Sequence, residues 1–547
     1  MVWHAEDTKS LEGIPQYGSR PNKTPHSALF LKVISYDYIR YLKLNAAVFN
    51  NDAKGCSDRI IPTFGMAACQ RVGMPLNAIY LFLLIIRQMQ FWVRSTFGLS
   101  NGFYGNLESG NIPPLPQNSA NDITILHGRI HGMMQGSSSA PLIWLLVHLV
   151  IFTALAKATP GFTASCHDNR IRSHRKGEGF VDDTDLWVTQ DLKSSSTTLA
   201  SLQLLARLWH TYLQISGGAL GITKCFYYDI RWRWTQTGNA KMINDLHNDT
   251  MVSLVNSTDN SEIPITQVKT SSGLRTLGVR LAPDGNFQDE FKHRLEQANE
   301  ITTSMKRYHY TRFEARLAYH RVWWPKMAYP LPVTNFSNAQ CQKLQSTFDK
   351  TFLPRLGINR QTPKAIIHGP ATLGGLSFKH VYTEQGALHA SLLLYHLRQP
   401  TTEQCNQMSQ IMLSHLAIES GLSASPLSID VPMHHLRNYL LPSFLKTTWL
   451  YLHNIGAEIK SSSIHALESQ RTHDIFLMDE FTSLEISGKD IRRLQRCRLF
   501  LKATRLGDIT TFDGIRIHQS CLDGKPPCDR HQLKTYTKQK RPPKRDF

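Results

Sequence analysis

Two adjacent aspartates, Asp182 and Asp183, interrupt an otherwise apolar run at residues 179–188. Unpaired carboxylates in such a run are costly to bury without a cation or a strong hydrogen-bond donor, so the run requires a partner. The apolar residues on either side suit two short strands, with the acids at the hairpin turn between them. Both carboxylates then lie at one edge of a sheet, where a divalent cation that prefers oxygen ligands could bind. A polar turn between strands is the simpler interpretation of an isolated acidic pair.

Two further stretches change that interpretation. Residues 46–52 form a short apolar run that stops at Asp52, as a buried strand does when it delivers a side chain to the end of a sheet. Residues 132–141 form a loop of small residues that leads into a long apolar helix. In this order and at this spacing, the three stretches resemble motifs A, B and C of the reverse transcriptases of non-LTR retroelements.

The resemblance implies an α+β fold, in which a polymerase palm (an antiparallel sheet with helices on one face) precedes a helical thumb and a helical C-terminal region. It implies RNA-directed DNA polymerase activity on an RNA template and a DNA primer, with deoxynucleoside triphosphates as substrates. Asp52, Asp182 and Asp183 become the catalytic carboxylates that hold two Mg²⁺ ions, with Mn²⁺ as a possible substitute. Two such ions stabilise the attacking and leaving oxygens of an in-line displacement at phosphorus.

Four more residues acquire roles from the same resemblance. Lys224 ends a stretch similar to motif D and is expected near the pyrophosphate leaving group, as a cation or general acid. Gln135 and Gly136 are expected to line the nucleotide and template pocket. Arg20 belongs to a Gln-x-Gly-x-Arg loop that resembles the fingers segment, and we expect it at the nucleotide.

Ser57 departs from the family pattern. Most of these enzymes carry Phe or Tyr five residues after the first catalytic aspartate, where the ring blocks a ribose 2′-hydroxyl, whereas this chain has serine. We therefore expect Ser57 to line the nucleotide pocket and to leave room for ribonucleotides.

Two features are expected to hold nucleic acid. Leu277 and Gly278 resemble the hairpin that grips the primer end near the junction of palm and thumb. Residues 290–322 carry basic side chains among apolar positions, which resembles a thumb that holds the template and primer backbones. A charged, solvated helix face is the alternative for that region. The nucleic-acid contacts expected there are Arg307, Arg312 and Arg316.

The domain boundaries follow from these placements. Most of the fingers that usually precede motif A are missing, so the chain resembles a polymerase core truncated at its N-terminus. We expect a residual fingers segment (1–45), a palm (46–288), a thumb-like helical region (289–400), a helical C-terminal region (401–524) and a basic, disordered tail (525–547). Residues 79–92 and 140–156 are expected to be long apolar helices packed under the sheet.

The composition fits a nucleic-acid partner. The 547-residue chain has a formal net charge of +19, which points to a polyanion. Its nine cysteines are scattered singly, as in reduced intracellular proteins. The N-terminus has no secretory pattern, and the apolar run at 140–156 is short for a membrane span. We therefore expect an intracellular, nuclear location and no membrane partner.

Three alternatives stay open. A decayed or domesticated relative could bind nucleic acid without catalysis. A template-dependent RNA polymerase is more distant, because Phe-Val-Asp-Asp is closer to the reverse-transcriptase pattern than to Gly-Asp-Asp. His518 and Cys521, with Cys528 and His531, have ligand types for zinc, but their spacing departs from common zinc fingers.

Overall fold

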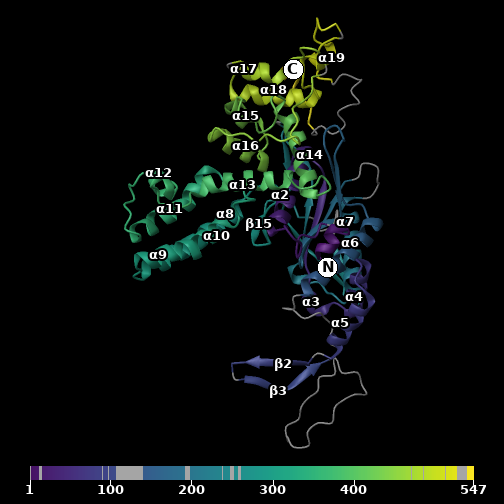
Figure 1. The fold of residues 1–547 in the computed structure, drawn as a ribbon. Coiled ribbons are helices and arrows are strands. Elements are labelled where there is room, and N and C mark those ends of the chain that lie inside the picture. The colour runs from purple at the N-terminus through teal and green to yellow at the C-terminus, as the bar shows by residue number, and fades with distance from the viewer. Residues whose placement is uncertain are drawn as a thin grey trace, which may run out of the picture.

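The chain was analysed as a computed structural model that describes residues 2–547 except for 12–14, 89, 97, 106–138, 191–196, 237, 247–251, 257–259, 470, 485, 512 and 526–538. A central sheet and its helices form the body of the molecule (Figure 1). A helical arm, defined here as residues 288–368, projects from this body, and the C-terminal helices gather at its upper end. The strands of the ribbon β2–β3 project at the opposite end (Figure 1).

The central sheet has five strands in the order β13-β8-β1-β7-β6. The middle strand β1 (Ala46–Asp52) is buried over its first six residues, which explains its apolar start. Its neighbours, β7 (Asp183–Thr189) and β8 (Phe226–Ile230), are both antiparallel to it. β6 (Gly177–Phe180) forms one edge, antiparallel to β7, whereas β13 (Thr266–Val268) forms the other edge and is parallel to β8.

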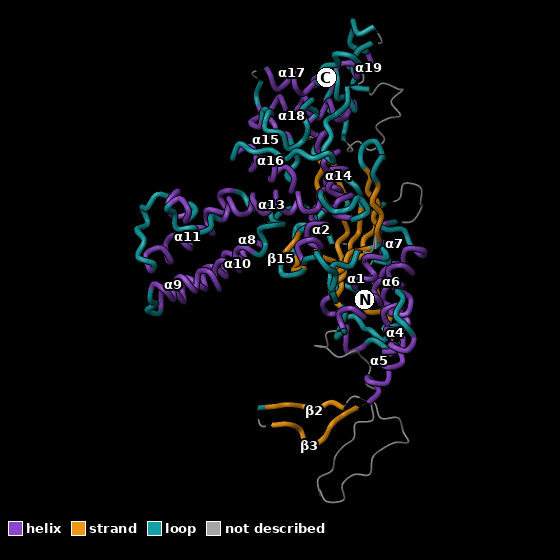
Figure 2. The backbone as a smooth tube through the Cα atoms, viewed as in Figure 1, coloured by secondary structure: helices purple, strands orange, loops and turns teal. Residues whose placement is uncertain are grey.

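Helices cover both faces of this sheet (Figure 2). Side chains alternate along a strand, so Ala47 and Phe49 share one core with α6 (Ala140–Ala158) and α7 (Thr198–Ile215). Ala46 and Val48 face the other core, with α2 (Pro25–Leu42) and α14 (Gln404–Ser420). The predicted α+β class, with an antiparallel-rich sheet and a helical C-terminal region, is confirmed. Helix α14 of the C-terminal region packs against α2 on this second face.

Helix α6 is the one described helix that is long and apolar enough to cross a membrane. In its most apolar window, 61% of the residues are buried inside the protein. It packs between α4 (Pro62–Arg71) and α7. The predicted core helix at this position is therefore confirmed.

The helix predicted for residues 79–92 differs from the observed structure. Helix α5 (Leu76–Gln88) ends earlier, and β2 (Gln90–Ser95) follows and pairs with β3 (Gly98–Gly105). The Phe-Trp-Val sequence in β2 combines aromatic and β-branched residues that favour strands. The helix also does not lie entirely under the sheet, because one side of it is apolar and exposed at Leu76, Tyr80, Leu81, Leu84 and Ile85.

The remaining strands form short antiparallel ribbons. They are β4 (Phe162–Ser165) with β5 (Arg172–Arg175), β9 (Trp232–Trp234) with β10 (Ala240–Met242), β11 (Ser253–Val255) with β12 (Glu262–Pro264), and β14 (Leu274–Thr276) with β15 (Val279–Leu281).

The helical arm has a core of aromatic side chains. Tyr319, Trp323 and Phe348 are fully buried and contact one another. A capping box begins α9, where the Thr311 hydroxyl accepts from the Glu314 N–H and the Glu314 carboxylate accepts from the Thr311 N–H. The helices of the arm are α8 (Gln288–Arg307), α9 (Arg312–Ala318), the π-helix η2 (Tyr319–Trp323), α10 (Trp324–Ala328), α11 (Asn338–Arg355) and α12 (Lys364–His368).

The C-terminal region is helical, as predicted. Ser487 caps α18 by accepting from the Asp490 N–H at 3.2 Å, at the position where the sequence indicated a cap. The other helices of this region are α13 (Val381–Leu397), α15 (Met433–Tyr439), α16 (Phe444–Asn454), α17 (Leu477–Ser483), α18 (Gly488–Leu501) and α19 (Gln519–Leu522). The short helices α1 (Val2–Asp7) and α3 (Cys56–Arg59) belong to the N-terminal half.

The described end of the tail contacts the C-terminal helices. Residues 539–547 contain the short helix η5 (Lys544–Asp546), which contacts α18. The Cys497 thiol donates to the Asp546 carbonyl at 3.1 Å, and the ring of Phe547 lies 6.0 Å from that of Phe500. The terminal aromatic residue gives this basic tail an apolar contact that its charge composition does not reveal.

Candidate active site

The three predicted acids meet at one end of the central sheet. Asp52 ends β1 and lies directly opposite Asp183, the first residue of β7. Residues opposite each other in an antiparallel pair have Cα atoms about 4.5–5.5 Å apart, so these two carboxylates are neighbours. Asp182 lies in the turn between β6 and β7, and its carbonyl accepts from the Ala53 N–H at 3.1 Å.

Lys224 contacts this acidic group directly. Its ammonium Nζ donates to Asp52 Oδ2 at 2.7 Å, and its side chain is 69% exposed. The short helix η1 (Ile222–Lys224) holds the lysine in place, because the Gly221 N–H donates to the Asp52 carbonyl at 2.9 Å. The hydrogen bond from Lys224 to Asp52 raises the pKa of the lysine.

The acids crowd one another electrostatically. Burial raises the pKa of Asp183 to about 6, and the charges of Asp182, Asp185 and Asp52 add to the effect. Burial and the charge of Asp52 also raise the pKa of Asp182. A cation at this edge would relieve the repulsion between the carboxylates. Among the described residues, however, no three His, Cys, Asp or Glu side chains are grouped so that they could hold a metal ion.

The turn that carries Asp182 is held in an unusual conformation. Val181 has φ of 57°, in the left-handed region that a β-branched residue rarely adopts. Gln16 bonds both sides of this residue, since its Oε1 accepts from the Val181 N–H at 3.2 Å and its Nε2 donates to the Val181 carbonyl at 3.1 Å. The indole of Trp144 donates to the same carbonyl at 2.5 Å. Such strain persists where surrounding contacts fix it, so Gln16 helps to hold the turn that carries Asp182.

A cavity of about 950 Å³ opens beside the acids. Asp52 and Asp183 line one side of it, together with Lys224. The predicted residues Leu277 and Gly278 also line it, in the turn between β14 and β15. The lining also includes three further basic side chains: Arg275, Arg294 and Lys326.

The turn of Leu277 and Gly278 is fixed by the helical arm. Both residues have positive φ, 47° and 85°, as a tight two-residue hairpin turn requires. The Tyr329 hydroxyl donates to the Leu277 carbonyl at 2.6 Å, and Arg294 Nη2 donates to the Gly278 carbonyl at 2.7 Å. The basic side of the cavity is therefore built jointly by the hairpin and the arm.

Arg20 lies elsewhere than expected. Its side chain is buried and bonds Glu6 through two contacts of 2.7 and 2.8 Å, and it is absent from the cavity lining. The loop of Arg20 thus joins the N-terminal helix to the body, while Gln16 of the same loop reaches the catalytic turn.

The other predicted residues are less informative. The backbone of Ser57 lies in α3, just after Asp52, and its side chain is not described. Gln135 and Gly136 lie outside the described residues. The basic residues predicted to bind nucleic acid are all exposed on the helical arm: Arg307, Arg312 and Arg316.

Sequence reasoning missed several residues of this site. Arg275 and Lys326 are exposed basic side chains in the lining, and only the three-dimensional fold brings them into the same cavity as the acids. Gln16 carried a signal, since it stands in the loop that resembled a fingers segment. Asp185 was visible as a third acid in the Asp-Asp-Thr-Asp sequence, but its partner was not.

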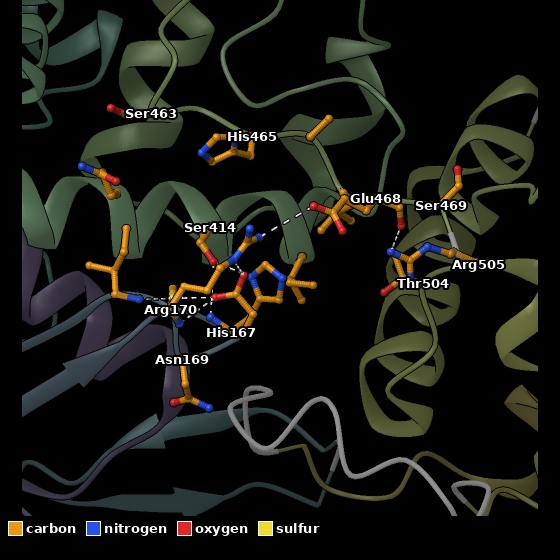
Figure 3. Close-up of a pocket in the computed structure, with 17 residues that line it drawn as sticks. His167, Asn169, Arg170, Ser414, Ser463, His465, Glu468, Ser469, Thr504 and Arg505 are labelled. Atoms are coloured by element: carbon orange, nitrogen blue, oxygen red, sulfur yellow. Dashed lines mark hydrogen bonds and ion pairs between the residues drawn. The ribbon is translucent and has the colours of Figure 1, made fainter. Parts of the chain in front are cut away.

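A second cavity, of about 810 Å³, lies between the β4–β5 ribbon, α14 and the segments near residues 463–469 and 504–505 (Figure 3). Its charged groups contact one another or the backbone. Asp168 pairs with Arg170, and Arg505 donates to the Glu468 carbonyl. None of the three catalytic candidates lines this cavity, so we assign the chemistry to the first one.

Comparisons with known proteins give little more. No protein-family model and no curated protein matches the chain. Among solved structures, the chain is similar to the structure of telomerase from Candida albicans in complex with a TWJ fragment of telomeric RNA, with a TM-score of 0.29 and 11% sequence identity. The match covers 76% of this chain and 53% of the telomerase chain, or about half of its length. At this TM-score the likeness carries no argument, and the interpretation of the site rests on its own geometry.

Proposed function

We propose that the chain is the palm and thumb core of an RNA-directed DNA polymerase of the reverse-transcriptase type. The observation that carries the proposal is the pairing of Asp52 with Asp183 at the end of two adjacent strands, in a cavity that basic side chains also line. Acids for metal ions and cations for phosphates in one cavity suit nucleotidyl transfer. The proposal includes a nuclear location, where such a template and primer occur.

Asp52, Asp182 and Asp183 would hold the two Mg²⁺ ions, or Mn²⁺ in their place. These hard oxygen donors fit Mg²⁺, which usually takes only one or two protein carboxylates together with substrate phosphates. When bound, the ions would supply charge stabilisation to the attacking and leaving oxygens. Burial raises the pKa of Asp183 and the neighbouring carboxylates add to the effect, so a bound cation would favour its ionised form.

Lys224 would act in two states. Without substrate its ammonium neutralises Asp52, as the 2.7 Å contact shows. With a nucleoside triphosphate bound, the exposed side chain is free to swing toward the leaving pyrophosphate, where it would offer a proton or a positive charge. In this proposal the triphosphate competes with Asp52 for the ammonium of Lys224.

The primer and template would lie along the basic side of the cavity. Arg275 and Lys326 are exposed there and suit phosphate contacts, which position nucleic acid without reading its sequence. The turn of Leu277 and Gly278 would lie against the primer end. Deoxynucleoside triphosphates would enter near Ser57, Gln135 and Gly136, as the sequence predicts.

A non-catalytic nucleic-acid-binding protein is the second candidate. The burial of Arg20 favours it, because this arginine is paired with Glu6 and so does not reach a triphosphate in this conformation. The two candidates share the basic surface and differ only in the use of the acids.

Primer extension separates the two candidates. Purified protein is incubated with a poly(rA) template, an oligo(dT) primer and dTTP, with Mg²⁺ or Mn²⁺. We expect extension by the wild-type protein and a loss of at least about 100-fold in Asp183→Asn and Asp52→Asn. Asp245→Asn, an exposed aspartate outside the cavity lining, is the matched control. Template binding without any extension would replace the polymerase proposal by the second candidate.

A further inference from the structure

A buried lysine lies directly beneath the proposed metal site. Lys32 of α2 is 1% exposed, and its ammonium Nζ donates to both carboxylate oxygens of Asp185 at 2.8 Å. The same Nζ donates to Thr276 Oγ1 at 2.9 Å. An ammonium has three N–H donors, so these three contacts use all of them.

Asp185 belongs to the same face of the sheet as the metal-binding acids. It stands two residues after Asp183, and its partner across the ladder is Asn50, two residues before Asp52. The Asn50 Nδ2 donates to Asp185 Oδ1 at 2.7 Å. Asn50 and Asp185 thus form the next pair on the same face of the ladder after Asp52 and Asp183.

Thr276 connects this pair to the hairpin beside the cavity. It is the last residue of β14, immediately before the turn of Leu277 and Gly278 that lines the cavity. Thr276 and Asp185 are 5% and 4% exposed, so the contacts of Lys32 with them are shielded from water. Lys32 is therefore a single group that bonds the strand of the catalytic acids and the strand of the primer-side hairpin.

We propose that Lys32 is a positioning residue that fixes the separation between the carboxylates of Asp52 and Asp183 and the turn of Leu277 and Gly278. This inference rests on the proposed function. In that function, the separation between the acids and the turn would set the distance between the metal ions and the primer 3′-hydroxyl. A misplacement of about 1 Å in such a geometry can cost about 100-fold in rate. The lysine itself touches neither substrate nor metal ion.

The test removes one contact at a time. Lys32→Met leaves the Asp185 charge buried without a counter-charge, and this variant risks failing to fold. Thr276→Val is gentler, because it keeps the side-chain shape and the ion pair and removes only the hydroxyl that accepts from Lys32. Thr276→Ser restores the hydroxyl. Thr334→Val is the matched control, because the buried Thr334 hydroxyl donates to the Pro330 carbonyl at 3.0 Å and Thr334 is absent from the cavity lining.

Two readouts are required, primer extension and amide hydrogen exchange. For Thr276→Val we expect kcat for single-nucleotide extension to fall at least about tenfold with a KM for dTTP within about threefold, and exchange at residues 274–281 to accelerate about tenfold. Thr276→Ser should recover both values, and Thr334→Val should change neither. A lowered kcat without rescue by serine would indicate a general structural effect and would overturn the positioning role.

The exchange measurement separates the two levels of the proposal. If the wild-type protein extends primers and Thr276→Val changes neither kcat nor exchange, the positioning role is refuted and the polymerase proposal stands. If the wild-type protein extends no primer, the polymerase proposal fails and the catalytic part of the inference fails with it. Exchange at residues 274–281 then still decides whether Lys32 ties the hairpin to the sheet.

Discussion

Gln16→Met should loosen the turn that carries Asp182. Gln16 is 1% exposed, and methionine has a similar length and volume but offers no amide group. The substitution removes acceptors for the N–H groups of Gly18 and Val181, now at 3.1 and 3.2 Å from Oε1. Burial lowers the pKa of His148 to about 3, so its ring is neutral and Nδ1 can accept a hydrogen bond. The substitution also removes the Gln16 Nε2 donor to this Nδ1, now at 2.6 Å.

The magnitude follows from the groups left without partners. The Val181 carbonyl keeps the indole of Trp144, so it stays satisfied. The two N–H groups lose their acceptors, and each buried unsatisfied group costs about 1–3 kcal/mol. The turn is only half-buried at Val181 and admits some water, so the lower part of this range applies. We expect the free energy of unfolding to fall by about 3 kcal/mol.

Urea unfolding measures this loss, and primer extension measures its functional consequence. Gln203→Met is the matched control: Gln203 bonds the Ser253 backbone in both directions at 2.7 Å, but it lies on α7 and is absent from the cavity lining. We expect both variants to lose stability and Gln16→Met alone to lose kcat. A loss of unfolding free energy below about 0.5 kcal/mol in Gln16→Met, or equal kcat in the two variants, would refute the role of Gln16 in holding the turn that carries Asp182.

Three further predictions concern pH and salt. Because metal binding requires an ionised carboxylate and the pKa of Asp183 is about 6, Mn²⁺ affinity should fall about tenfold per pH unit below that value, as measured by electron paramagnetic resonance. Burial raises the pKa of Glu419 from 4.5 to about 7, so the folded state holds a proton that the unfolded state releases. Glu419 should therefore contribute a decrease in stability of about 3 kcal/mol as pH rises from 4.5 to 7, and Glu419→Gln should reduce the pH dependence of the free energy of unfolding in urea by that amount. Alanine at the exposed arginines of the arm, Arg307, Arg312 and Arg316, should weaken binding of a primed template. The slope of log K against log salt concentration should become shallower by about 0.7–0.9 for each lost phosphate contact, as measured by fluorescence anisotropy.

The placement of Asp52 was predictable because its signal is local. An apolar run that stops at an acid indicates a strand whose last residue reaches the end of a sheet, and β1 has this form. The hairpin of residues 177–189 was predictable for the same reason. The pairing of Asp52 with Asp183 could be expected only from the order of the three motifs, since 130 residues lie between the two strands and periodicity carries no register between them.

Contacts between distant segments explain the errors. Arg20 matched a motif, but its position is decided by Glu6, and nothing in the sequence between them specifies that ion pair. The end of α5 was misplaced because Phe, Trp and Val fit both an apolar helix and a strand, and pairing with β3 decides between them. The packing of α14 against α2 carried no sequence signal, because the two helices lie far apart along the chain.

The ion pair of Lys32 and Asp185 could be predicted only in part, because the sequence indicates the buried acid but not the distant basic residue that pairs with it. Alternation along β7 places Asp185 on the face of Asp183, and a buried acid there requires a cation, but any basic residue of the chain could have supplied it. Stability does not explain the choice, because well-packed apolar side chains in place of a buried ion pair are often as stable or more so. An ammonium with three fixed acceptors does set the positions of the elements that carry them. For that reason, geometry at the neighbouring proposed metal site is the better account of this pair.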